Sequence, residues 1–228
     1  MKNPLAALFT LLVAISPASA AESYQLDGSH TSVIFGVSHM GLSYTYGRFN
    51  EVKGSYELDR ENLAASKFNM LINADSIDTN SQGRDQHLKG PDFFNASQFP
   101  AIRFESTKVV PKKVEGKTVL TITGNLTMHG VTKPITFDLL MVGEGQGPRG
   151  DFRTGFHTDT KIMRSQFGMT NMIPNIGDEI AVTISFEGLR QQTGARSISP
   201  STRPITAAPV RRRVHAGPRP PSPARMNR

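Results

Sequence analysis

Histidines are the side chains of this sequence best suited to acid–base or metal chemistry. Five histidines lie before residue 191: His30, His39, His87, His129 and His157. Metal-binding histidines on one strand or helix often follow H-x-H or H-x-x-x-H spacing, which none of these five shows. The chain has no cysteine, so thiolate zinc sites and disulfides are excluded. A metal site would require histidines brought together by folding, and we predict neither a metal nor a cofactor.

A second group of reactive side chains surrounds the third histidine. Arg84, Asp85 and His87 lie within four residues of one another. They form either a catalytic cluster, a clamp for a lipid head group, or the capping and ion pairs common at the start of a helix. The sequence contains no G-x-S-x-G nucleophile motif. We therefore predict that the protein is not an enzyme.

Charge is distributed unevenly along the chain. The net charge is +7, yet every charged residue from 191 to 228 is an arginine, in a stretch rich in proline. We predict a disordered tail there, which either rests on an anionic membrane surface or is a solvated appendage. The rest of the chain after residue 20 carries slightly more acids than bases. This balance argues against nucleic-acid binding.

The first 20 residues resemble a secretory signal peptide. Lys2 precedes an apolar run from Leu5 to Ile15, and Ala18-Ser19-Ala20 fits a cleavage site. The run is too short for a membrane-spanning helix. We expect a periplasmic protein without an integral membrane segment, whose residues 21–190 form one domain.

Alternating apolar and polar residues predict strands over most of this domain. The clearest pattern is a hairpin from Val119 to Val142, which turns at Thr127–Gly130. A change of parity near Asn50-Glu51 predicts a bulge in a long strand, and residues 78–94 predict one short helix. Periodicity alone leaves both an antiparallel sandwich and a closed barrel open. Further strands are predicted near residues 30–38, 68–74, 102–106, 152–160 and 180–186.

An irregular segment rich in methionine separates the last two predicted strands. It spans residues 161–177 and includes Met163, Met169 and Met172. Thioether side chains adapt to irregular apolar surfaces. The segment is either a lid over a barrel mouth or a loop packed on the core.

Four segments carry recognisable motifs: YQLDGSHTSVIFGVSHMG, SIDTNSQGRDQHLKGPDFFNASQFPAIRFES, GNLTMHGVTKPITF and IMRSQFGM. Together they resemble the YceI-like family of exported lipid- and polyisoprenoid-binding proteins. The resemblance covers residues 22–188; Thr31 stands where the family usually has serine, and the tail lies outside the pattern. It implies an all-β, lipocalin-like antiparallel barrel of about eight strands with a long apolar cavity. Family motif positions fall on His30, His39, Arg84, Asp85, His87, His129 and Arg164.

The inward rows of the predicted strands supply the candidate ligand-binding residues. The expected partner is a long-chain lipid or polyisoprenoid with or without a phosphate, and a homodimer is possible. Alternatives are a histidine-based envelope enzyme and an interaction protein whose barrel is filled by its own side chains. The apolar candidates are Val33, Phe35, Val37, Met70, Ile72, Phe104, Ile122, Phe137, Leu139, Met141, Met169, Ile184 and Phe186. The polar candidates are His30, His39, Arg84, His87 and Arg164.

Overall fold

The computed structural model describes residues 21–192, most of which lie in strands. The predicted signal peptide and nearly all of the predicted tail lie outside this range. One α-helix, α1, spans Gln82–Lys89, and a 3-10 turn, η4, spans Arg164–Phe167. The strands are β1 Glu22–Leu26, β2 Ser32–His39, β3 Ser43–Phe49, β4 Val52–Leu58, β5 Lys67–Asn73, β6 Ile77–Asp78, β7 Ala101–Val114, β8 Lys117–Met128, β9 Val131–Gln146, β10 Phe152–Met163 and β11 Ile176–Arg190.

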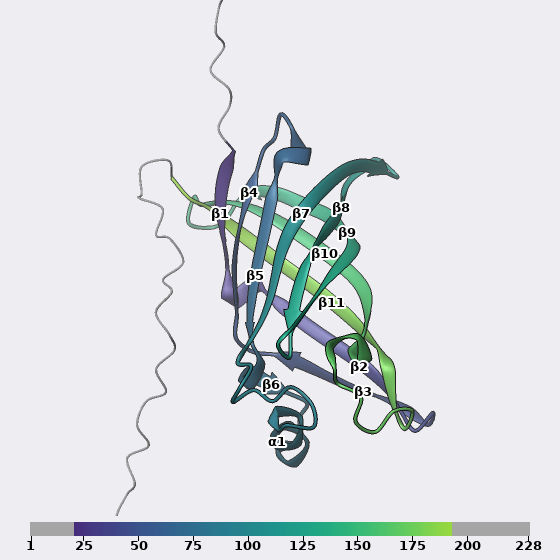
Figure 1. The fold of residues 1–228 in the computed structure, drawn as a ribbon. Helices are drawn as coiled ribbons and strands as arrows, with labels where there is room; N and C mark the ends of the chain where they lie inside the picture. Colours follow the sequence, from purple (N-terminus) through teal and green to yellow (C-terminus); the bar gives the residue numbers. More distant parts are fainter. Residues whose placement is uncertain (1–20, 193–228) are drawn as a thin grey trace, which may run out of the picture. The chain divides into compact units, whose positions relative to one another are not determined.

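The strands close into an eight-stranded antiparallel barrel (Figure 1). Its order is β1-β4-β5-β7-β8-β9-β10-β11, and β11 pairs with β1 to complete the ring. The predicted barrel and its single α-helix are confirmed. Because Tyr24 pairs with Arg190 and Val33 with Ile184, β1 and β2 lie one after the other along β11. The bulge predicted in a long strand near Asn50-Glu51 is wrong, because these residues separate two strands, β3 and β4, which pair with different neighbours.

Aromatic rings fill one end of the barrel, which we call the plug end. The rings of Tyr24 and Tyr56 stack with centroids 4.7 Å apart. Tyr56 also contacts Phe68, Phe156 and Phe186, with centroids 5.4 to 6.0 Å away. Such aromatic pairs stabilise a core beyond the area that they bury. The plug end is therefore solid protein.

The absence of a side chain at Gly188 makes room for the Tyr56 ring. A Cβ atom at Gly188 would overlap the Tyr56 hydroxyl oxygen. We expect Gly188→Ala to lower the free energy of unfolding by about 2 kcal/mol, because the buried ring must shift. Gly155→Ala is the control, since its Cβ meets only Gly143 O at 3.7 Å. Urea unfolding of both variants checks this, and equal stabilities would contradict it.

The opposite end of the barrel carries α1 and η4, and we call it the α1 end (Figure 1). A second cluster of buried apolar residues lies there and includes Val33, Ile72, Met128, Phe167 and Met169. Met70 and Ile184 pack against both this cluster and the plug cluster, so they lie between the two. Within the described residues, no helix is long and apolar enough to cross a bilayer.

Candidate functional site

An apolar cavity lies inside the barrel, between the plug end and the α1 end. It reaches from Tyr56 and Phe186 in the plug to Leu88 and Phe94 near α1, and its volume is about 190 Å³. The wall contains few polar residues, and the remaining lining is apolar. A wall of this kind suits an apolar chain far better than a polar metabolite. The polar lining residues are Ser55, Asn69, Thr158, Thr160 and Arg164.

Most of the candidate ligand-binding residues line this cavity. Several, among them Phe35, Val37 and Phe137, are only half-buried although they point inward. The cavity leaves part of each side chain without a protein neighbour, so apolar surface remains available to a ligand. Whether these residues bind one stays a prediction. The lining includes Val33, Phe35, Val37, Met70, Ile72, Phe104, Ile122, Phe137, Leu139, Met169, Ile184, Phe186 and Arg164.

Met141 does not line the cavity, which corrects the sequence-based expectation. The alternation of Met141 with Leu139 on β9 correctly predicted that its side chain faces the barrel interior. Met141 packs against the plug cluster, and it lies opposite Phe156 in the β9–β10 ladder. Its side chain therefore contacts the plug cluster and not the cavity.

Sequence reasoning missed several lining residues near the α1 end. Leu88 belongs to α1, and Phe93 and Phe94 follow it in a loop, where no strand alternation could indicate an inward face. The paired phenylalanines themselves were a usable signal, because a soluble loop rarely places two such rings in water. Ile180 and Val182 also line the cavity. Their alternation with Ile184 on β11 had already placed them on the same face.

Arg164 is the one charged residue on the cavity wall formed by residues 21–192, and it is 4% exposed. Its guanidinium donates hydrogen bonds to the backbone carbonyls of Met169, Asn171, Ile176 and Gly177, at 2.8 to 2.9 Å. Burial lowers the pKa of this guanidinium below its usual value. Arg164 thus fixes the segment after η4, which favours a packed loop over a lid. Its positive charge remains beside the cavity.

Arg84, Asp85 and His87 lie outside the cavity wall, so the structure does not place them in the candidate site. Asp85 accepts hydrogen bonds from the backbone N–H and hydroxyl of Thr79, and Arg84 donates to the same hydroxyl and to the Thr79 carbonyl. His87 is exposed and lies 3.5 Å from Asp92. This geometry fits the alternative of helix capping and ion pairing, in place of a catalytic cluster or a head-group clamp.

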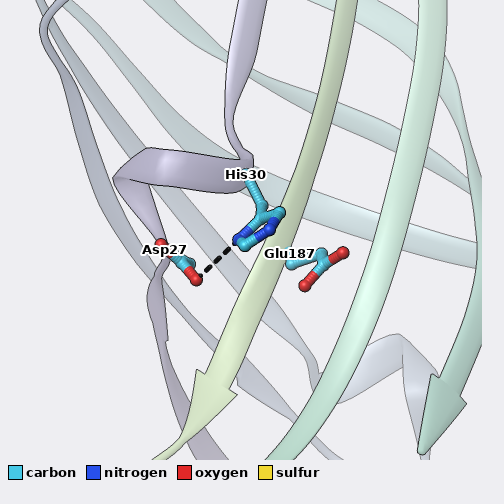
Figure 2. Close-up of side chains that lie close together, drawn as sticks. All are labelled: Asp27, His30 and Glu187. Atoms are coloured by element: carbon cyan, nitrogen blue, oxygen red, sulfur yellow. Dashed lines mark hydrogen bonds and ion pairs between the residues drawn. The ribbon is translucent and has the colours of Figure 1, made fainter. Parts of the chain in front are cut away.

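His30 and His39 also lie outside the cavity. Figure 2 shows His30 on the outside of the barrel, with Asp27 and Glu187. His30 Nδ1 lies 2.9 Å from Asp27 Oδ2, and ligand atoms of all three residues come within 4.8 Å of one another. Arg153 Nη1 donates to both carboxylates at 2.8 Å. The positive charge of Arg153 therefore balances these carboxylates, as a metal cation would. The arrangement is therefore a network of ion pairs. His39 is exposed at the end of β2.

The remaining histidines make separate local contacts. His129 Nδ1 lies 3.0 Å from the Phe167 carbonyl oxygen, in the turn between β8 and β9. His157 lies 3.1 Å from Asp159 on β10. None of the five histidines lines the cavity. They are not gathered into the single cluster that a histidine-based enzyme would require.

A second ion network joins β1 to the end of β11. Burial of Glu22 opposes its ionisation, but hydrogen bonds from Tyr24, Arg60 and Arg190 prevail and lower its pKa from 4.5 to about 2. The stabilisation is present above pH 4.5 and is lost as the pH falls towards 2. We expect Glu22→Gln to be less stable than wild type at pH 7, with the difference shrinking towards pH 2.

Urea unfolding between pH 2 and pH 7 measures this difference directly. Glu57→Gln is the matched control, because Glu57 is exposed and its nearest cation, Lys67, lies 3.6 Å away. That variant should follow the wild-type curve. A constant difference between Glu22→Gln and wild type across the whole range would contradict the prediction.

A family model described as the YceI-like domain matches residues 24–188. The chain belongs to the YceI-like family. Among curated relatives, it is 39% identical over 193 residues to Protein YceI of Salmonella agona (strain SL483). The match covers 84% of this chain and 99% of that protein. The resemblance inferred from the sequence motifs is therefore confirmed.

Solved structures of other proteins share the barrel. BcnA of Burkholderia cenocepacia matches with a TM-score of 0.63 at 21% identity, over 71% of this chain and 98% of that one. The YceI protein of Campylobacter jejuni matches with a TM-score of 0.59 at 25% identity, over 82% and 100%. A domain from Saccharophagus degradans, described as polyisoprenoid binding, matches with a TM-score of 0.58 at 15% identity, over 76% and 100%.

The motif segments of this YceI-like chain mainly build the α1 end of the barrel. The RDQHL segment forms most of α1, and RSQF forms η4. The Met128–Val131 turn places His129 and Gly130 at φ 52° and 74°, a backbone region that glycine adopts without strain. Three distant parts of the sequence thus build this end of the barrel.

Proposed function

We propose that this YceI-like protein is a binding protein that holds a long-chain amphiphile, a polyisoprenoid or a fatty-acid-like lipid, in its barrel. The observation that carries the proposal is the cavity, whose wall is apolar apart from five residues. The plug closes one end, so the tail enters with its apolar terminus towards Tyr56 and its head towards the α1 end. This direction leaves the polar head near water.

Burial of the tail supplies the binding energy. Each methylene transferred from water contributes about 0.8 kcal/mol, so a partly enclosed chain binds firmly without polar contacts. Apolar contact is not directional, and tails of similar shape should compete with one another. Arg164 adds a positive charge to the wall. Most of its donors already serve backbone carbonyls, so we propose that it favours a phosphate or carboxylate head by its field and not by direct clamping.

We further propose that the protein is exported and serves as a periplasmic carrier or store. The signal-like residues 1–20 support export. The polyisoprenoid-binding description of the Saccharophagus degradans domain supports the ligand class. Two features disfavour the alternatives: the histidines have separate partners, and the interior is hollow between the plug and α1.

Native mass spectrometry of the full chain tests the proposal, followed by organic extraction and identification of the released lipid. We expect a long-chain species at close to one per chain. If the protein is purified without ligand, it should bind polyprenyl phosphates or fatty acids on incubation. A ligand-free mass that persists after incubation with both classes would contradict the proposal.

A further inference from the structure

Exposed apolar side chains gather beyond the α1 end of the barrel. We call this group the apolar rim. On the β2–β3 hairpin it includes Leu42, which is 82% exposed, and Tyr44 and Tyr46 at 68% and 66%. The hairpin extends past the barrel beside the start of β11 (Figure 1). The rim consists of Met40, Leu42, Tyr44, Tyr46, Met172 and Ile173.

The two parts of the rim lie side by side although they are far apart in the sequence. The Met40 N–H donates to the Asn175 carbonyl at 2.6 Å. Ile176 pairs with His39 in the β2–β11 ladder. The hairpin turn and the loop before β11 therefore form one continuous surface.

Charged side chains are absent from both segments that build the rim. Residues 32–47 and 165–177 contain no Asp, Glu, Lys or Arg, in a chain of which 20% is charged. Lys161 and Glu179, on neighbouring strands, pair with each other at 2.8 Å. Because the rim segments carry no acid, they would not repel the anionic groups of lipid heads. Exposed apolar patches bordered by polar surface mark interaction sites.

The order of residues along β3 indicates the kind of partner. Tyr44 and Tyr46 alternate with Thr45 and Gly47 on β3 and share its exposed face, and Leu42 lies in the turn just before the strand. An aliphatic residue at the outermost point, followed by tyrosines, matches the depth profile of a bilayer interface. In such an interface, leucine side chains are buried in the hydrocarbon, and tyrosine side chains are enriched at the level of the lipid head groups.

Two chain segments connect the rim to the cavity wall. Val37 lines the cavity, and Met40 of the rim lies three residues further along the same hairpin. Ile176 also lines the cavity, three residues after Ile173 of the rim. The same two chain segments therefore carry both the rim and part of the cavity wall.

We propose that the apolar rim docks the protein on the surface of a phospholipid bilayer, with Leu42 inserted and Tyr44 and Tyr46 at the interface. Docking of this kind lets a lipid tail pass between bilayer and cavity with little exposure to water. Only this transfer step rests on the proposed function; the docking itself does not. Vesicle binding tests the docking, and lipid extraction tests the proposed lipid-binding function, so the failure of one is distinguishable from the failure of the other.

The experiment measures binding of the full chain to phosphatidylcholine vesicles by co-sedimentation. Zwitterionic lipid limits the contribution of the arginine-rich tail, and all variants keep the same termini. We expect Leu42→Asp/Met172→Asp to bind at least tenfold more weakly than wild type. The matched control is Val110→Asp/Val114→Asp, which places the same charges at exposed valines on β7, 44% and 46% exposed. The control should bind as wild type does.

A tryptophan reporter locates the contact. The chain has no tryptophan, so Tyr44→Trp introduces a single one into the rim. We expect its emission to shift to the blue on vesicle binding and to be quenched by bromine-labelled lipid. Wild-type protein that stays unbound at millimolar lipid, or tryptophan emission of Tyr44→Trp that vesicles leave unchanged, would overturn the proposal.

A second copy of the chain is the competing occupant of the rim. Within the described residues, β3 pairs on its outer side only at Arg48 and Phe49, which leaves Ser43–Gly47 as a free edge. Analytical ultracentrifugation separates the two cases. A dimer that Leu42→Asp/Met172→Asp converts to monomer, together with equal vesicle binding by wild type and variant, would assign the rim to self-association and overturn membrane docking.

Discussion

Phe137→Asp is expected to abolish binding of long-chain lipid. Phe137 lines the cavity, and its ring lies 5.3 Å from that of Phe104. An aspartate at this position places a carboxylate in an apolar wall. A bound lipid tail would remove water from this carboxylate and could not replace the lost hydrogen bonds. We expect affinity for a fatty acid or polyprenyl phosphate to fall at least 30-fold, which corresponds to about 2 kcal/mol. Titration monitored by native mass spectrometry measures the loss.

The control for this variant is Val142→Asp. Val142 lies on the same strand but is 63% exposed, so the new carboxylate meets water. This variant should bind lipid as wild type does. Both variants should unfold cooperatively in urea, because Phe137 is only half-buried and its carboxylate can be hydrated through the cavity. Unchanged lipid binding by folded Phe137→Asp would remove β9 from the binding wall.

Arg164→Met is expected to destabilise the fold by about 3 to 5 kcal/mol. Methionine fills much of the same space but cannot donate to the carbonyls that Arg164 now satisfies, including those of Met169 and Gly177. Each buried carbonyl left without a partner costs about 1 to 3 kcal/mol, and the costs are not additive. Urea unfolding at pH 7 measures the change.

Arg164→Lys separates the shape of this side chain from its charge. Lysine keeps the positive charge, but one ammonium group cannot replace the planar guanidinium that reaches Asn171, Ile176 and two further carbonyls. We expect this variant to lose nearly as much stability as Arg164→Met. A loss below about 1 kcal/mol in Arg164→Met would mean that the loop finds other partners, and that the main role of Arg164 lies with the ligand.

The sequence by itself determined the strands and the family. Alternation identified the hairpin that became β8 and β9, and the parity change at Asn50-Glu51 coincides with the boundary between β3 and β4 instead of a bulge. Both signals are local, because the strand period of two assigns each side chain to a face without reference to other strands. The combined motifs identified the YceI-like family, and the family resemblance implied a barrel.

Only the tertiary structure decided which inward residues face a cavity and which face the plug. Leu139 and Met141 share one face of β9, yet only Leu139 lines the cavity, because Met141 packs against the plug cluster, beside Phe156 of β10. Periodicity gives the direction of a side chain but not what it meets. Likewise, Arg164 sits in a predicted motif, while its partners are backbone carbonyls that carry no sequence signal. Both the position of a side chain along the barrel axis and the partners of Arg164 depend on how distant strands pack together. They follow from barrel closure and strand register, which no single segment of the sequence encodes.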